Sequence, residues 1–240
     1  MKASGKRWPT LKRAARAFVI ALLVLVGAPY LIAPLYRFVN PISTLMLWNW
    51  VTGERVERIW IPITQMSPSV PLAVIVAEDG RFCTHRGVDF GELWAAIREA
   101  DDLGEARGGS TITQQVAKNL FLWQSRSFVR KALELPLALW INLVLPKARV
   151  LEIYLNIAEW GPDGEFGVQA GALYAFDRPA SRLTAGEAAL LASVLPNPVE
   201  RDARQPGPGL RRVAGVHLRR MATMTRNDAC IRPRRAGASQ

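Results

Sequence analysis

The strongest pattern in the sequence is a long apolar run close to its beginning. From Ala17 to Tyr36 there are twenty residues without a charged side chain, and a helix of this length spans about 30 Å, the thickness of a membrane's hydrocarbon core. The preceding segment has no acidic residue and contains Lys2, Lys6, Arg7, Lys12, Arg13 and Arg16. Because basic flanks stay in the cytoplasm, the pattern predicts a cytoplasmic N-terminus at residues 1–16, a single transmembrane helix at residues 17–36 in the cytoplasmic (inner) membrane, and a periplasmic or extracellular remainder.

A cleaved signal peptide has the same basic start and apolar middle, and it is the alternative to an anchor. The apolar run is longer than a signal peptide needs and no small-x-small cleavage site follows it, so we favour the anchor. A membrane-proximal segment follows at residues 37–70. Its aromatic stretch from Phe38 to Trp50 suits either the membrane interface, where tryptophan is enriched, or an ordinary buried segment, and the sequence leaves both open.

Apolar positions at helical spacing continue through residues 71–198, where Pro and Gly mark short loops. The stretch from Pro71 to Glu78 predicts an apolar helix that begins with proline at its first position, and Asp89 is placed to cap the next one. The pattern predicts one mainly α domain at residues 71–198, followed by a basic C-terminal extension at residues 199–240 that forms a solvated helix or a frayed end.

Capping signals divide the second half of this domain. Ser127 can cap a helix whose apolar part, Leu135 to Leu145, has eleven residues and is too short to span a membrane. Thr184 and Glu187 have the spacing of a capping box before another apolar helix. Together with the helix that follows Pro146, this last helix is expected in the core.

Composition and charge narrow the classes of function. The 240 residues allow one domain of ordinary size, and the net charge is +11. A basic surface favours anionic lipid, a phosphorylated substrate or nucleic acid. Nucleic acid is disfavoured as a partner, because the anchor would place the basic extension outside the cytoplasm.

Cysteine and histidine are scarce, with Cys83, Cys230, His85 and His217 as the whole set. None has the spacing of a metal site, so we expect no structural zinc and no bound metal of this kind. The two cysteines could form a disulfide in an oxidising compartment, but two unpaired thiols are the preferred interpretation.

Two groups of residues are candidates for chemistry. Glu78 and Asp79 end an apolar helix, where burial raises a carboxylate's affinity for protons toward that of a general base. Arg126, Arg130 and Glu134 lie four residues apart, so in a helix they share one face with Lys131 beside them. Such cations could neutralise a leaving pyrophosphate. The bland alternatives are a structural salt bridge for the first group and a solvated Arg–Glu face for the second.

Five stretches in order resemble the conserved motifs of the family 51 glycosyltransferases, the polymerase module of class A penicillin-binding proteins and their monofunctional relatives. They are EDGRFCTHRGVD from Glu78, GGSTITQQVAKN from Gly108, RKALE from Arg130, KARVLEIYLN from Lys147, and a region that contains Trp160-Gly161-Pro162. The resemblance runs from about Pro71 to Pro198. Five ordered motifs are far more specific than a single glycine signature.

The resemblance implies a mainly α, lysozyme-like, two-lobed helical domain beside the membrane, with an N-terminal transmembrane helix. It implies that the chain polymerises lipid II into β-1,4-linked glycan strands with inversion and releases undecaprenyl pyrophosphate. Its partners would be lipid II, the growing strand, the membrane and other cell-wall synthesis or division proteins. No S-x-x-K or K-T-G occurs in the sequence, so no transpeptidase activity is expected.

The resemblance also implies roles for single residues. Glu78 would be the general base, and Glu134 would orient the cations or a divalent ion, Mg²⁺ or Mn²⁺, at the pyrophosphate. The residues expected to hold the pyrophosphate are Lys118, Arg126 and Arg130. Those expected to line the cleft and position the sugars are Ser110, Thr111, Gln114 and Gln115. Supporting roles fall to Asp79, Phe82, His85 and Lys131, and Glu152 and Asn156 would hold helices together.

Two other functions are alternatives to a polymerase. A lysozyme-like hydrolase would need a carboxylic acid to protonate a leaving sugar oxygen, whereas a pyrophosphate leaves as an anion and needs positive charge. Lys118 and the face formed by Arg126, Arg130 and Glu134 favour the transferase. A catalytically silent scaffold is disfavoured because Glu78 and Glu134 are both present.

Overall fold

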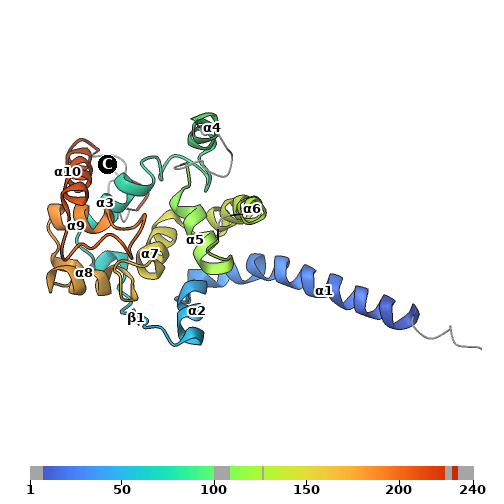
Figure 1. Cartoon of the computed structure of the whole chain (residues 1–240). Coiled ribbons are helices and arrows are strands. Elements are labelled where there is room, and N and C mark those ends of the chain that lie inside the picture. Colours follow the sequence, from blue (N-terminus) through green and yellow to red (C-terminus); the bar gives the residue numbers. More distant parts are fainter. Residues whose placement is uncertain (1–7, 100–108, 126, 225–228, 232–240) are drawn as a thin grey trace, which may run out of the picture.

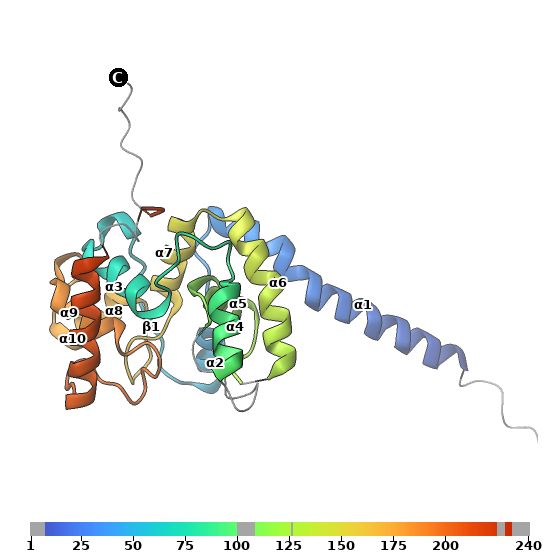
Figure 2. The ribbon, with the colours of Figure 1, turned by 90° about the horizontal axis from the view of Figure 1, so that it is seen from above.

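The protein is mainly helical, which confirms the predicted fold class. The computed structural model describes residues 8–99, 109–125, 127–224 and 229–231. Within these residues, two groups of helices lie side by side with α7 (Lys147–Ile157) between them, and a long helix projects away from both (Figures 1 and 2).

The projecting helix is α1 (Trp8–Ile32), continued by the short helix η1 (Ala33–Arg37). A segment from Lys12 to Arg37 is long and apolar enough to cross a membrane, and nearly all of its most apolar stretch lies outside the protein's core. Near its end, Trp140 Nε1 donates a hydrogen bond to the Tyr30 carbonyl at 2.9 Å. The predicted apolar helix is therefore present, and its C-terminal end is fixed to the domain.

The aromatic stretch after the apolar helix is not an ordinary buried segment. Helix α2 (Thr44–Thr52) turns Met46 and Asn49 inward, but Trp48 and Trp50 are 62% and 52% exposed, and Phe38 before the helix is 82% exposed. An exposed aromatic group beside an apolar span is typical of a membrane interface.

One lobe is formed by helices whose apolar faces meet around α9. Helix α9 packs on α3 and α10, and α10 also packs on α3. In α10, Ala214 and Met221 are buried while its arginines face outward, so part of the C-terminal extension belongs to the folded lobe. The elements of this lobe are α3 (Ser69–Glu78), α8 (Val168–Phe176), η3 (Ala180–Arg182), α9 (Ala185–Ala192) and α10 (Pro208–Thr223).

The other lobe is built around α5, which packs against α2, α6 and α7. Helix α7 carries seven buried residues from Val150 to Ile157, which confirms that it belongs to the core. Helix α4 follows the loop after α3 and lies on the side of α5 and α6 (Figure 2). The helices are α4 (Phe90–Glu99), α5 (Ile112–Phe121) and α6 (Phe128–Val144).

Helix caps predicted from the sequence are present. Ser127 accepts a hydrogen bond from the Arg130 amide at 3.1 Å, and Thr184 with Glu187 forms a complete capping box. Asp89 Oδ1 accepts from the amides of Gly91 and Glu92 at the start of α4. Helix α3 begins two residues earlier than expected, so its proline lies in the first turn rather than at the first position.

Three short elements attach the segment at residues 37–70 to the rest of the domain. Strand β1 (Glu57–Arg58) pairs in parallel with β2 (Glu165–Phe166), and η2 (Ile63–Gln65) follows β1. Asn156 fixes this segment to α7, because its side chain accepts from the Ile61 amide and donates to the Ile61 carbonyl, both at 2.9 Å. Glu152 accepts from the Ile63 amide at 2.9 Å.

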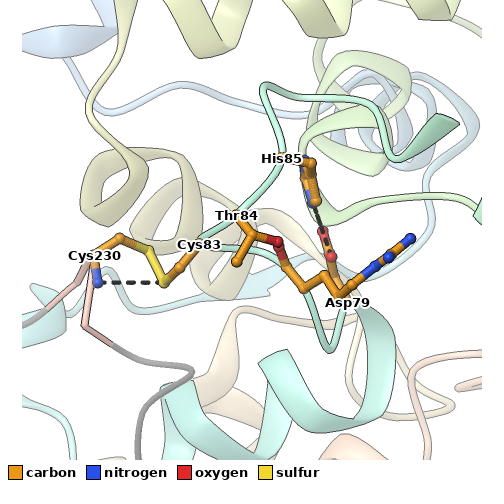
Figure 3. Close-up of a disulfide and its surroundings, with 6 residues drawn as sticks. Asp79, Cys83, Thr84, His85 and Cys230 are labelled. Carbon is orange, nitrogen blue, oxygen red and sulfur yellow. Dashed lines mark hydrogen bonds and ion pairs between the residues drawn. A yellow bond between two sulfur atoms is a disulfide. The ribbon is translucent and has the colours of Figure 1, made fainter. Parts of the chain in front are cut away.

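The expectation of two unpaired thiols is wrong, because Cys83 and Cys230 form a disulfide with a Cα–Cα distance of 5.4 Å (Figure 3). The bond ties the C-terminal segment to the loop after α3, and the Cys230 amide also donates to the Cys83 sulfur at 3.3 Å. The two cysteines are 147 residues apart in the sequence, so no local pattern indicated that they lie close together. Their proximity arises when α10 packs on α3.

We expect Cys230→Ser to lower the free energy of unfolding by about 2 to 4 kcal/mol, because the disulfide closes a long loop in the unfolded chain. Thermal unfolding of the full chain in detergent measures the loss as a lower Tm. Reducing the wild-type protein should lower its Tm to that of the variant and leave the variant unchanged. Equal Tm values for oxidised wild type and variant would contradict a stabilising role.

Candidate active site

The candidate base, Glu78, lies at the last position of α3, where the chain leaves an apolar helix. Burial raises the pKa of its carboxyl, while a hydrogen bond from Gln115 and the charges of Lys118 and Arg201 act in the opposite direction. Gln115 Nε2 donates to Glu78 Oε2 at 2.8 Å, and the Tyr154 hydroxyl donates to Gln115 Oε1 at 2.8 Å. This relay from α7 through α5 fixes the carboxylate in position.

The neighbouring Asp79 faces a different set of partners. His85 Nε2 lies 2.9 and 3.0 Å from its two oxygens (Figure 3), and the Ile112 amide donates to it at 3.0 Å. Since the Gly87 amide donates to His85 Nδ1 at 3.1 Å, the proton of this imidazole is on Nε2 and points at Asp79. Asp79 therefore connects its own loop to the start of α5 and is not placed as a second base.

Phe82 packs beneath this loop and is fully buried. The Lys147 ammonium lies over its ring at 4.4 Å, and burial lowers the pKa of Lys147 to about 8. The Phe82 ring and the Lys147 ammonium both face the interior. This pair therefore fits a supporting role and not contact with substrate.

The second candidate carboxylate, Glu134, is 3% exposed and has a cation on each oxygen. Arg130 Nη1 lies 2.6 Å from Oε2 and Lys131 Nζ lies 2.7 Å from Oε1. Arg130, Lys131 and Glu134 form a cluster on α6. Lys131 also donates to Ser110 Oγ at 2.9 Å, so this α6 cluster reaches the loop before α5. Arg126 lies outside the described residues.

Lys118 is influenced by both candidate carboxylates. Burial, followed by the charge of Arg130, lowers the pKa of its ammonium, and the carboxylates of Glu134 and Glu78 raise it. The ammonium of Lys118 is therefore close enough to both acids for each of them to influence its charge. The structure therefore brings together Glu78, Gln115, Lys118, Arg130, Lys131 and Glu134.

The residues expected to line the cleft divide into two groups. Ser110 and Thr111 line a cavity of about 350 Å³ together with Glu78, and Gln115 lines a second cavity of about 190 Å³ together with Lys118. Gln114 does neither: it is fully buried and its Oε1 accepts from the Thr111 amide to complete a capping box. The expectation that Gln114 lines the cleft is wrong, because the helix start uses its side chain.

Three residues near the site were missed by the sequence reasoning. Tyr154 lies on the helix after Pro146, which was expected in the core, and its hydroxyl reaches Gln115. Arg201, whose guanidinium donates to the Ser193 carbonyl at 2.9 Å, acts on Glu78, and Arg220 lines the larger cavity. Both arginines lie in the segment expected to be an extension, so no motif indicated them.

Comparison with known families and proteins gives a consistent result. The family model described as Transglycosylase matches residues 46–223. A Nitrobacter hamburgensis protein named biosynthetic peptidoglycan transglycosylase is 57% identical over 208 residues, which cover 87% of this chain and 92% of that protein. Proteins of the same name from Rhodopseudomonas palustris and Agrobacterium fabrum are 57% and 48% identical, over 88% and 90% of this chain and 90% and 96% of their own lengths.

Proposed function

The chain belongs to the transglycosylase family and is a peptidoglycan glycosyltransferase, and we propose that it polymerises lipid II into β-1,4-linked strands with release of undecaprenyl pyrophosphate. The observation that carries the proposal is the setting of Lys118, a half-buried cation that lines the same cavity as Gln115, the partner of Glu78, and whose charge is influenced by both Glu78 and Glu134. A base on one side and positive charge on the other are what attack by a hydroxyl and departure of a pyrophosphate require.

In the proposed reaction, Glu78 takes the proton from the acceptor sugar's 4-hydroxyl as that oxygen attacks the donor's anomeric carbon. The bond from this carbon to the pyrophosphate breaks on the opposite face, which inverts the configuration. Lys118 and Arg130, with Arg126, take up the charge that develops on the leaving pyrophosphate. Glu78 and Arg130 need little rearrangement during the reaction, because Gln115 already holds Glu78 and Glu134 already holds Arg130.

The partners of Glu134 favour a transferase over a hydrolase. A glycosidase needs a carboxylic acid beside its leaving sugar oxygen, but both oxygens of Glu134 already accept hydrogen bonds from cations. We infer that Glu134 orders Arg130 and Lys131 and does not deliver a proton. Because no cluster of three His, Cys, Asp or Glu able to hold a metal occurs among the described residues, a Mg²⁺ or Mn²⁺ ion would be held mainly by the substrate's phosphates.

The proposed localisation is the cytoplasmic membrane, with the catalytic domain on its outer side. An N-terminal apolar helix that could serve as an anchor or a signal is present, and the exposed Trp48 and Trp50 lie beyond its end. The basic residues before it support a cytoplasmic N-terminus. Interaction with other cell-wall synthesis or division proteins stays a prediction.

The activity is tested by incubating the purified full chain with lipid II in detergent and separating polymer from monomer. One molecule of undecaprenyl pyrophosphate should be released for each glycosidic bond formed in the polymer. Absence of peptide cross-links in a product made from lipid II would support the proposed lack of transpeptidase activity. Release of disaccharide without polymer would instead indicate a hydrolase.

A reporter fused after Gln240 should be active outside the cytoplasm and should stay in the membrane fraction, because the basic residues hold the N-terminus inside. Protease protection and fractionation of cells that express the fusion measure this. Moving the same reporter to the N-terminus is the matched control and should give a cytoplasmic signal. A soluble external product with a shortened N-terminus would show that the apolar helix is a cleaved signal.

A further inference from the structure

Glu159 opens onto the smaller cavity of the active site, and the mechanism above gives it no task. It lies just after α7, where its backbone forms an antiparallel bridge with Phe166. It lines the cavity of about 190 Å³ that Gln115 and Lys118 also line. Of the described residues around this cavity, Glu159 is the one acid and Lys118 the one cation.

The carboxyl of Glu159 differs from the other acids near the site in having no partner. Glu78 and Glu134 accept hydrogen bonds from Gln115 and from cations, and Glu165 accepts from the Asp163 amide at 2.9 Å. Within the described part of the chain, no hydrogen bond or ion pair involves the Glu159 side chain. An acid that is half-buried and unpaired beside a groove is available to a ligand.

The charges around Glu159 disfavour its ionised form. Burial raises its pKa to about 7, and the carboxylates of Glu165 on β2 and Glu54 after α2 raise it as well. Lys118 on α5 faces the same cavity, but no ion pair within 4.0 Å joins it to Glu159. At neutral pH the carboxyl is therefore divided between a charged form and a neutral form that can donate a hydrogen bond.

An anionic substrate favours the neutral form of Glu159. An ionised Glu159 would repel a pyrophosphate held by Lys118, whereas a protonated one can donate to a phosphate oxygen. A neighbouring negative charge raises the pKa of a carboxyl further, so arrival of the substrate favours the neutral form. A carboxylic acid that stays neutral in order to donate a hydrogen bond is a known device of enzyme sites.

Resting on the function proposed above, we propose that Glu159 is a further substrate-binding residue that donates a hydrogen bond, as a neutral carboxylic acid, to a phosphate oxygen of the lipid-linked substrate beside Lys118. Binding then takes up one proton. The affinity for substrate falls as pH rises above the pKa of Glu159 in the free enzyme, while the chemical step keeps its own dependence on Glu78.

The test measures KM and kcat for lipid II polymerisation by the full chain in detergent between pH 6 and 9. For the wild type, KM should rise above about pH 7 by up to about tenfold per pH unit, the limit for one linked proton. Glu159→Gln has a permanent amide donor, so its KM should stay near the low-pH wild-type value and lose that rise, with kcat little changed. Lys118 is present in both proteins, so any contribution from its titration cancels in the comparison.

Glu54→Gln provides a second variant that leaves Glu159 in place. Removing this negative neighbour lowers the pKa of Glu159, so the rise in KM should begin at lower pH than in the wild type. A purely structural role for Glu159 would not produce this shift. Identical KM profiles in wild type, Glu159→Gln and Glu54→Gln would overturn the inference.

Direct binding separates this inference from the proposed function. The probe is a lipid I analogue with a farnesyl chain, whose pyrophosphate is a diester and does not titrate near neutral pH. Wild type should bind it more weakly at pH 8.5 than at pH 6, and Glu159→Gln should bind it equally at both. Equal binding by the wild type at both pH values would reject the inference, whereas a wild type that binds the probe but makes no polymer would count against the proposed function.

Discussion

Glu78→Gln is expected to lower the rate of lipid II polymerisation by about a hundredfold to ten thousandfold, which corresponds to about 3 to 5 kcal/mol of transition-state stabilisation. The amide keeps the shape of the side chain but cannot accept the acceptor's proton. Lys118 and Arg130 remain to hold the donor's pyrophosphate, so binding of the farnesyl lipid I analogue should be nearly unchanged. Turnover and binding measured on the same preparation separate the two effects.

Stability should change little or in the opposite direction. Burial raises the pKa of Glu78, so the folded state prefers the protonated carboxyl, and this contribution to stability is lost as pH rises through the raised pKa. At neutral pH a neutral Gln removes the cost of a buried charge, and the Tm of the variant should equal or exceed that of the wild type. A large loss of rate together with an unchanged or higher Tm identifies a functional residue.

The same raised pKa sets the acid limb of the activity. The base works only when ionised, so kcat/KM should fall as pH decreases through a value above the usual range of a glutamate, and the acid limb should disappear from the residual activity of the Gln variant. Glu57→Gln, a change at a carboxylate that pairs with Arg55 away from both cavities, is the matched control. Normal polymerisation by Glu78→Gln would remove it from the mechanism.

Local signals in the sequence were sufficient for most of the helices, because caps and apolar spacing act over a few residues. The caps at Ser127 and Thr184 begin helices where predicted. Contacts between distant segments were not predictable in the same way. The disulfide of Cys83 and Cys230 and the packing of α10 on α9 depend on how distant segments fold together within one lobe, and no local pattern carries that information.

Within the site, a pairing along one helix was likewise predictable, whereas contacts between different elements were not. The four-residue spacing predicted the pairing of Arg130 with Glu134, since both lie on one helix face. Gln114 and Gln115 were treated alike, although adjacent helical residues point about 100° apart. One is used by the capping box and the other reaches Glu78. Glu159 belongs to no charged pattern in the sequence. Its charged neighbours come from distant segments, namely α5, β2 and the residues after α2, so local spacing could not indicate them.

Glu134→Gln is expected to lower turnover by about a hundredfold to a thousandfold, the usual effect of removing one preorganised electrostatic contact from a site of this kind. The carboxylate now holds Arg130 and Lys131 at 2.6 and 2.7 Å. A Gln side chain has one acceptor oxygen, so it can keep one of these cations and turns an amide toward the other. The loosened cation would then be less well placed for the leaving pyrophosphate.

Loss of this carboxylate also threatens the fold, because breaking a buried ion pair by removing one partner costs about 3 to 5 kcal/mol. Turnover is therefore measured at temperatures well below the Tm of the variant, with circular dichroism to show that the domain is folded. Glu187→Gln is the control, since it removes a carboxylate that pairs with Arg178 at 3.3 Å in a capping box outside both cavities. If Glu134→Gln lowered only the Tm and kept normal turnover in the folded state, the pairing of Glu134 with its cations would be structural, and the charge at the leaving group would have to be organised by Lys118 and its neighbours without it.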